Sequence, residues 1–118
     1  MTTMTHSHVD AAIYAELQDI MADEFAELVE FFLTDTQQCL MTLQDCLATQ
    51  DSDQVGAICH KLKSSCKLIG AFPLAEFAHS LEEYRENHDH AAAAHSLSEL
   101  RAEFVHVLDW LNQHTATA

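Results

Sequence analysis

The chain has 118 residues, and 19 acidic side chains against 5 basic ones give it a formal net charge of -14. This length suits one domain, and a hydrophobic content of 48% is enough for one packed core. Only 2 glycines and 1 proline are present, which excludes turn-rich small β-sandwiches and barrels. The negative charge argues against binding to nucleic acid or to an anionic membrane surface.

The two ends of the chain have no periodic hydrophobic pattern. Residues 1–8 and 115–118 are rich in Thr, His and Ala, so we expect flexible termini around a single domain over residues 9–114. The first ten residues contain no Lys, no Arg and no apolar block, unlike a signal or transit peptide. No apolar run approaches the roughly 20 residues that cross a bilayer. We therefore expect a cytoplasmic protein.

Hydrophobic residues recur at helical spacing through this domain. A short stripe predicts a short first helix, and its members are Val9, Ile13, Leu17 and Ile20. A longer stripe predicts a helix over residues 23–48. The carboxylates of Asp51 and Asp53 can cap the next helix, which we expect to end near Gly70, because glycine is favoured where a helix terminates.

Two further helices complete the pattern. Pro73 suits a first helical turn, and the apolar residues after it predict a helix of about 15 residues. Ser96 and Glu99 have the spacing of a capping box at or near the start of the last helix. Short connections force long neighbouring helices to run antiparallel. The sequence therefore predicts an all-α fold, an antiparallel up-down four-helix bundle with a short additional N-terminal helix.

The four cysteines form no CxxC pair, so we expect reduced thiols. In an antiparallel hairpin centred near residue 52, Cys39 would face Cys66 and Cys46 would face Cys59, which leaves a four-thiolate zinc site as an alternative. Zinc ligands usually lie closer along the chain than seven residues, which favours free thiols packed as small hydrophobic residues. A helical bundle that binds metal through His and Cys remains the second hypothesis.

His60 is the candidate functional residue. On a helical wheel of residues 53–70 the apolar side chains share one face, and His60 points away from it towards solvent. An exposed histidine is usually a solvated surface residue. Here the positions one turn before and one turn after it are small, Gly56 and Ser64. Since glycine inside a helix costs about 1 kcal/mol relative to alanine, we interpret Gly56 as space cleared around the imidazole for a partner.

Basic residues are concentrated around this histidine. Lys61, Lys63 and Lys67 are three of the five in the chain, and the latter two share the face of His60. Ammonium groups in these positions would stabilise a negative group on the ring, as they do for phosphoryl oxygens. The pattern predicts a histidine that carries a phosphoryl group transiently.

The run from His60 to Ala71, HKLKSSCKLIGA, resembles the signature of the histidine-containing phosphotransfer (HPt) domain. This run combines a nucleophile, a cation, small residues and a helix end. The segment from Leu74 to Glu82, which follows it, also has the spacing typical of the family. The resemblance implies a four-helix bundle that relays a phosphoryl group. The histidine would accept it from the receiver-domain aspartate of a hybrid sensor histidine kinase and pass it to an aspartate of a response regulator.

The resemblance also implies roles for individual residues. His60 would be phosphorylated, Lys63 would be the cation beside it, and Ser64 would be the small residue that lets a receiver approach. Glu82 matches a Gln or Glu that hydrogen-bonds the ring from the neighbouring helix. A carboxylate that accepts from Nδ1–H would fix the tautomer and leave Nε2 as the nucleophile. His79 matches no role in the family.

No phosphate-binding glycine loop and no kinase motif are present. We therefore expect no ATP binding, no metal or other cofactor of its own and no independent enzymatic turnover; the receiver domain would supply the Mg²⁺ that phosphoryl transfer usually requires. An adaptor that binds receivers without accepting phosphate is a further alternative. Whether the domain stands alone or is part of a larger kinase stays open.

The expected partners are receiver domains, and the domain is expected to be a monomer. The acidic phosphorylation site of a receiver domain would meet the basic cluster around His60. The expected docking residues are Gly56, Ser64, Lys67, Ile13, Leu17 and Met21. The last three could equally cap the core of the bundle.

Overall fold

The computed structural model describes residues 7–115, so residues 1–6 and 116–118 of the expected flexible termini lie outside the described range. The described chain is all-helical, which confirms the predicted fold class. None of its helices is long and apolar enough to cross a membrane. The helices are α1 (Ala11–Met21), η1 (Ala22–Glu24), α2 (Phe25–Ala48), α3 (Ser52–Ile69), α4 (Phe72–Glu82), α5 (Tyr84–Asn87) and α6 (His90–Thr115).

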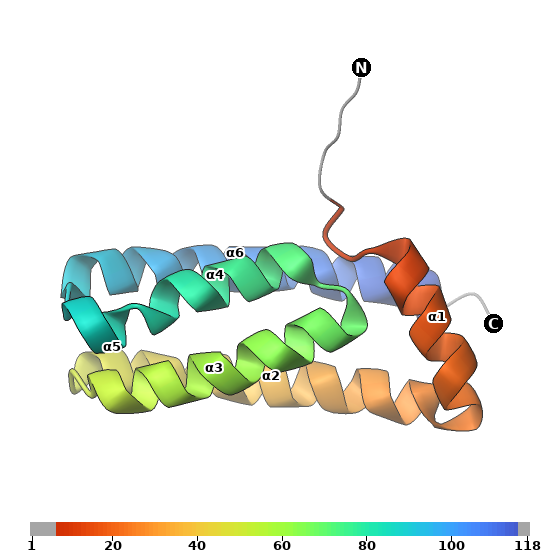
Figure 1. The fold of residues 1–118 in the computed structure, drawn as a ribbon, viewed down its shortest axis with the longest axis horizontal. Coiled ribbons are helices and arrows are strands. Elements are labelled where there is room, and N and C mark those ends of the chain that lie inside the picture. The colour runs from red at the N-terminus through yellow and green to blue at the C-terminus, as the bar shows by residue number, and fades with distance from the viewer. Residues whose placement is uncertain (1–6, 116–118) are drawn as a thin grey trace, which may run out of the picture.

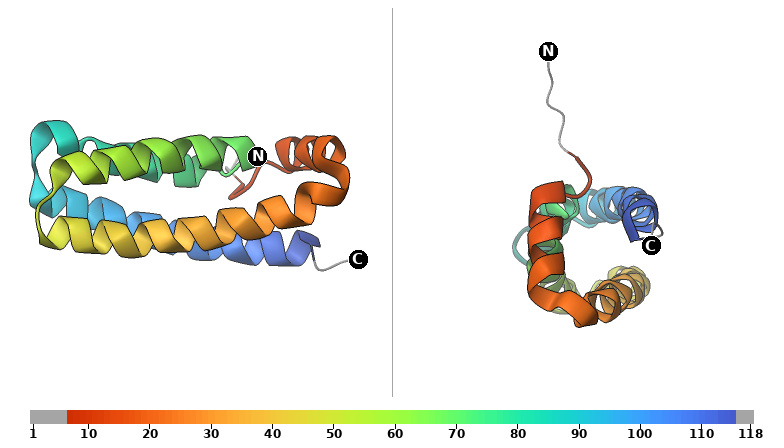
Figure 2. Two further views of the ribbon diagram at one scale, coloured as in Figure 1. Left: turned by 90° about the horizontal axis from the view of Figure 1, so that it is seen from below. Right: turned by 90° about the vertical axis from the view of Figure 1, so that its right-hand side faces the viewer.

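The long helices α2, α3, α4 and α6 lie side by side, each running opposite to the one before it (Figure 1). Helix α3 contacts both α2 and α4, and α6 contacts the same two helices. Helix α1 crosses one end of this bundle (Figure 2). The outer surface of α3 beside α4 is therefore left uncovered by α1 and α6.

Caps fix both ends of α3. The Asp51 carboxylate accepts a hydrogen bond from the Gln54 backbone N–H at 3.2 Å, and Gly70 ends the helix in the left-handed conformation at φ 91°. Both agree with the sequence prediction. The Gly70 carbonyl also accepts a hydrogen bond from the Asp10 backbone N–H at 2.8 Å, which ties the start of α1 to the turn between α3 and α4.

The structure defines three helix boundaries more closely than the sequence did. The helix expected over residues 23–48 starts at Phe25, because residues 22–24 form a 3-10 turn. The helix after Pro73 is divided into α4 and α5. The last helix starts at His90, where the Asp89 carboxylate accepts from the Ala92 backbone N–H at 3.1 Å. Ser96 therefore lies inside α6, which is one of its two expected places, and Asp89 rather than Ser96 caps the helix.

The core is formed by one face of each helix. The buried face of α3 contains Val55, Cys59, Leu62, Cys66 and Ile69.

All four cysteines are free, and Cys39 and Cys46 are half-buried. Burial raises the pKa of the Cys59 and Cys66 thiols to about 12. Over residues 7–115 no group of three or more His, Cys, Asp or Glu side chains is arranged to hold a metal ion, so the metal-binding alternative is not favoured.

Candidate functional site

His60 lies on the outer face of α3, and its side chain is 67% exposed. The neighbouring Cys59 and Leu62 point into the core at 0% and 1% exposure. The hydrophobic pattern of the helix thus orients the imidazole outward, as predicted. An imidazole in this position is accessible to a macromolecule.

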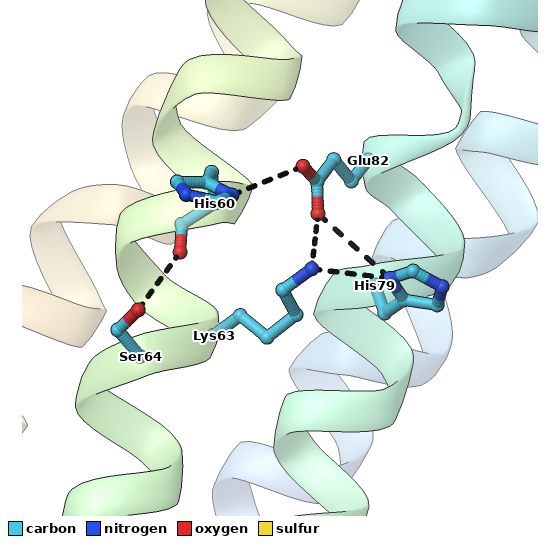
Figure 3. Close-up of polar contacts among 5 residues, drawn as sticks. All are labelled: His60, Lys63, Ser64, His79 and Glu82. Atoms are coloured by element: carbon cyan, nitrogen blue, oxygen red, sulfur yellow. Dashed lines mark hydrogen bonds and ion pairs between the residues drawn. The ribbon is translucent and has the colours of Figure 1, made fainter.

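Glu82, the last residue of α4, lies opposite His60 and holds its ring (Figure 3). Its Oε2 atom is 3.3 Å from His60 Nδ1, and its Oε1 atom accepts a hydrogen bond from Lys63 Nζ at 2.7 Å. Burial raises the pKa of Glu82, but the hydrogen bonds and positive charges of Lys63 and His60 outweigh this effect, so the pKa is lowered. The carboxylate is therefore ionised at neutral pH.

This ionised carboxylate determines the tautomer of His60. A carboxylate without a proton can only accept hydrogen bonds, so the hydrogen atom of the contact belongs to Nδ1. In the neutral ring Nε2 then carries the free lone pair. The arrangement leaves Nε2 as the nucleophilic atom of an exposed, oriented imidazole.

Lys63 is held between two side chains of α4. Besides Glu82, its Nζ atom contacts His79 Nδ1 at 3.2 Å, and His79 Nδ1 is 3.8 Å from Glu82 Oε1. The Lys63 side chain is only 18% exposed. Sequence reasoning assigned His79 no role, although its position three residues before Glu82 places both on one face of α4.

Ser64 and Lys67 lie on the exposed side of α3, one and two turns after His60. The Ser64 hydroxyl donates a long hydrogen bond of 3.5 Å to the His60 carbonyl oxygen. Lys67 lines a shallow hollow of about 330 Å³ between α3 and α4. The other residues that line it are Lys63, Phe72, Ala75, Glu76 and His79. This surface combines positive charge with apolar area.

Gly56 does not clear space for a partner, which corrects the interpretation of the sequence. It is buried, and the guanidinium of Arg85 from α5 lies against its α-carbon, where a β-carbon would overlap with Arg85 Nε. The absence of a side chain at Gly56 therefore admits a residue of the same chain. Nothing in the sequence pattern of α3 indicated this, because the contact joins residues far apart in the chain.

The predicted docking residues of α1 differ in accessibility. Ile13 and Met21 are half-buried, but Leu17 is 9% exposed and belongs to the core, so it cannot offer a docking surface. Helix α1 crosses the end of the bundle with Tyr14 and Leu17 directed inward. Ile20, which sequence reasoning placed in the same apolar stripe, is 74% exposed.

Comparisons with known proteins agree with this geometry. A family model described as "Hpt domain" matches residues 27–110. The crystal structure of histidine-containing phosphotransfer protein B (HptB) from Pseudomonas aeruginosa PAO1 is similar, with a TM-score of 0.88 at 26% sequence identity, covering 93% of this chain and 96% of that one. A search of curated proteins gave no match.

Proposed function

The chain belongs to the Hpt domain family, and from this premise we propose that His60 is the residue that carries the phosphoryl group of a phosphorelay. The single observation behind this assignment is the exposed imidazole whose Nδ1 atom lies 3.3 Å from the ionised Glu82. The scaffold is an antiparallel up-down four-helix bundle over residues 9–114, with α1 as its short additional helix. We expect it to act as a monomer.

In the proposed reaction, His60 Nε2 attacks the phosphorus atom of an aspartyl phosphate on a receiver domain. The P–O bond to the aspartate breaks as the P–Nε2 bond forms, and the aspartate leaves as a carboxylate. The proton on Nδ1 stays in place and is shared with Glu82 Oε2. The second transfer, to the aspartate of a response regulator, reverses these bond changes. The chain is a carrier in this scheme, and ATP is not a reactant.

Glu82 and Lys63 would act by positioning the ring. Glu82 stabilises the positive charge that the imidazole gains while the phosphoryl group is attached. Lys63 holds the Glu82 carboxylate at 2.7 Å and keeps it ionised. The Mg²⁺ that neutralises phosphoryl charge in such transfers would be supplied by the receiver domain.

Apolar surface beside α3 supports docking of a receiver domain. Leu68 on α3 is 55% exposed and Phe31 on α2 is 67% exposed, and both line a hollow of about 110 Å³. Exposed apolar groups next to a charged site are typical of protein–protein interfaces. The further expected contacts are Ile13, Met21, Ser64 and Lys67. We also propose the cytoplasm as the compartment, and the four free cysteines support this, since cytosolic thiols are kept reduced.

Transfer of radiolabelled phosphate from a phosphorylated receiver domain tests the proposal. The protein should gain an acid-labile label, and His60→Gln should gain none. His95→Gln is the matched control, because His95 is 74% exposed on α6, outside the site, and this variant should still be labelled. Label that persists in His60→Gln would refute the assignment. Binding of the receiver without label in the wild type would favour the adaptor alternative.

A further inference from the structure

Arg85, a cation on α5, has no ion-pair partner within 4.0 Å in the part of the chain that the structure describes. No hydrogen bond or ion pair within 4.0 Å involves it among residues 7–115, and its Nε atom is buried without a partner. Three glutamates line the same hollow of about 170 Å³, namely Glu82, Glu83 and Glu86. The guanidinium instead lies against Gly56, and its terminal nitrogen atoms, unlike the buried Nε, are the donors that could reach an external acceptor.

The position of this guanidinium is close to His60. Gly56 precedes His60 by one turn, about 6 Å along the axis of α3, and helical side chains lean towards the N-terminus, over the preceding turn. The imidazole therefore leans towards Gly56, whereas Lys63 and Ser64 lie on its C-terminal side (Figure 3).

The basic residues already described near His60 do not balance the charge of a phosphoryl group on its ring, which leaves a role for Arg85. A phosphoryl group adds a charge of about -2 at neutral pH. Lys63 is already paired with Glu82, so these two charges offset each other. Lys67 lies about 10 Å further along the helix axis than His60. Arg85 lies against Gly56, one turn before His60 on α3, and forms no ion pair in the part of the chain that the structure describes.

We propose that Arg85 binds the phosphoryl group on His60 Nε2, donating hydrogen bonds from its guanidinium to the phosphoryl oxygens. This inference rests on the proposed function of His60. It also explains Gly56: glycine at this position leaves room for the guanidinium beside α3, at a cost in helix propensity of about 1 kcal/mol. An alanine there would displace the end of the Arg85 side chain without removing its charge.

The test measures phosphoryl uptake from a phosphorylated receiver domain at several receiver concentrations. Arg85→Gln should lower the maximal rate about tenfold, as expected for loss of a charge-assisted hydrogen bond, with a smaller change in the receiver concentration at half-maximal rate. Arg85→Lys should recover part of the rate. Arg101→Gln is the matched control: it removes the same charge from α6, where Arg101 donates to Gln44 at 2.7 Å, and it should leave the rate unchanged.

Gly56→Ala separates phosphoryl binding from a structural role of Arg85. It should raise or preserve the melting temperature, because alanine favours the helix, and yet slow uptake as Arg85→Gln does. Adding Gly56→Ala to Arg85→Gln should slow uptake no further, because both act through one side chain.

Wild-type labelling on His60 with unchanged rates in Arg85→Gln and Gly56→Ala would overturn the role of Arg85 and leave the proposed function intact. An equal effect of Arg101→Gln would also overturn it, since only net charge would then matter. Absence of labelling in the wild type would instead refute the proposed function itself.

Discussion

Replacing Lys63 with glutamine should lower the free energy of unfolding by about 1 kcal/mol at neutral pH. The Lys63 Nζ and Glu82 Oε1 atoms are 2.7 Å apart, and the two side chains are only 18% and 19% exposed. Exposed ion pairs contribute about 0.2–1 kcal/mol, and a short, partly buried, charge-assisted hydrogen bond belongs at the upper end. With an unfolding entropy of about 0.25 kcal/mol/K for a chain of this length, the melting temperature should fall by about 4 °C.

The effect of Lys63→Gln should depend on pH. The pKa of Glu82 is lowered in the folded protein, so the folded state binds this proton more weakly than the unfolded chain does. The resulting stabilisation is complete above the unfolded pKa of about 4.3 and is lost as the pH falls through the folded value. The difference in stability between the wild type and Lys63→Gln should therefore be constant near neutral pH and shrink in acid.

Urea unfolding followed by circular dichroism, at about pH 7 and about pH 3, measures both quantities. Lys61→Gln is the matched control, because Lys61 is exposed, lies on the same helix and has no ion pair among the described residues. It should change stability by less than about 0.5 kcal/mol. Equal stabilities of the two variants at neutral pH, or an undiminished difference in acid, would refute the role given to the Lys63–Glu82 pair.

Three further substitution or labelling experiments test the scaffold. Gly70→Ala should lower stability by about 1–2 kcal/mol in thermal unfolding, because φ is 91° at this position and alanine is strained there; a loss below about 0.3 kcal/mol would contradict the assigned helix end. Asp89→Ala removes the side chain that caps α6 and should cost about 1 kcal/mol in urea unfolding. In the native protein a thiol reagent should modify the half-buried Cys46 before the buried Cys59 and Cys66. Mass spectrometry of the labelled peptides measures this order, and earlier modification of Cys59 or Cys66 would contradict it.

Local sequence patterns predicted much of the fold. The spacing of hydrophobic residues predicted the inward face of α3, because residues on one face of a helix recur about every 3.6 positions. Asp51 and Gly70 were recognisable as caps because their effects extend over only a few neighbouring residues. The division between α4 and α5 was missed because it lies at Glu83, whose backbone stays in the right-handed helical region at φ -63° and ψ -16°, so no Gly or Pro marks it. Leu17 was misplaced because burial of α1 depends on how it crosses the bundle.

The candidate site was predictable where one helix supplies it. The exposed position of His60 follows from the wheel of α3 alone, and the resemblance to a family added Glu82. The contact of Lys63 with His79 and that of Gly56 with Arg85 were beyond sequence reasoning, because each joins two helices whose relative rotation is set by packing of the whole core. The sequence indicated free space beside Gly56, but the sequence of α3 alone could not show that the Arg85 side chain fills this space.

The site of phosphorylation is the most direct measurement of the central claim. Long-range ¹H–¹⁵N NMR spectra of the protein, recorded after incubation with a phosphorylated receiver domain, identify both the modified histidine among the 9 in the chain and the nitrogen that bears phosphorus. We predict a single phosphohistidine, at His60 Nε2, with Nδ1 still protonated beside Glu82. Phosphorus on Nδ1 of His60, or on any other histidine, would contradict the proposed function of this site.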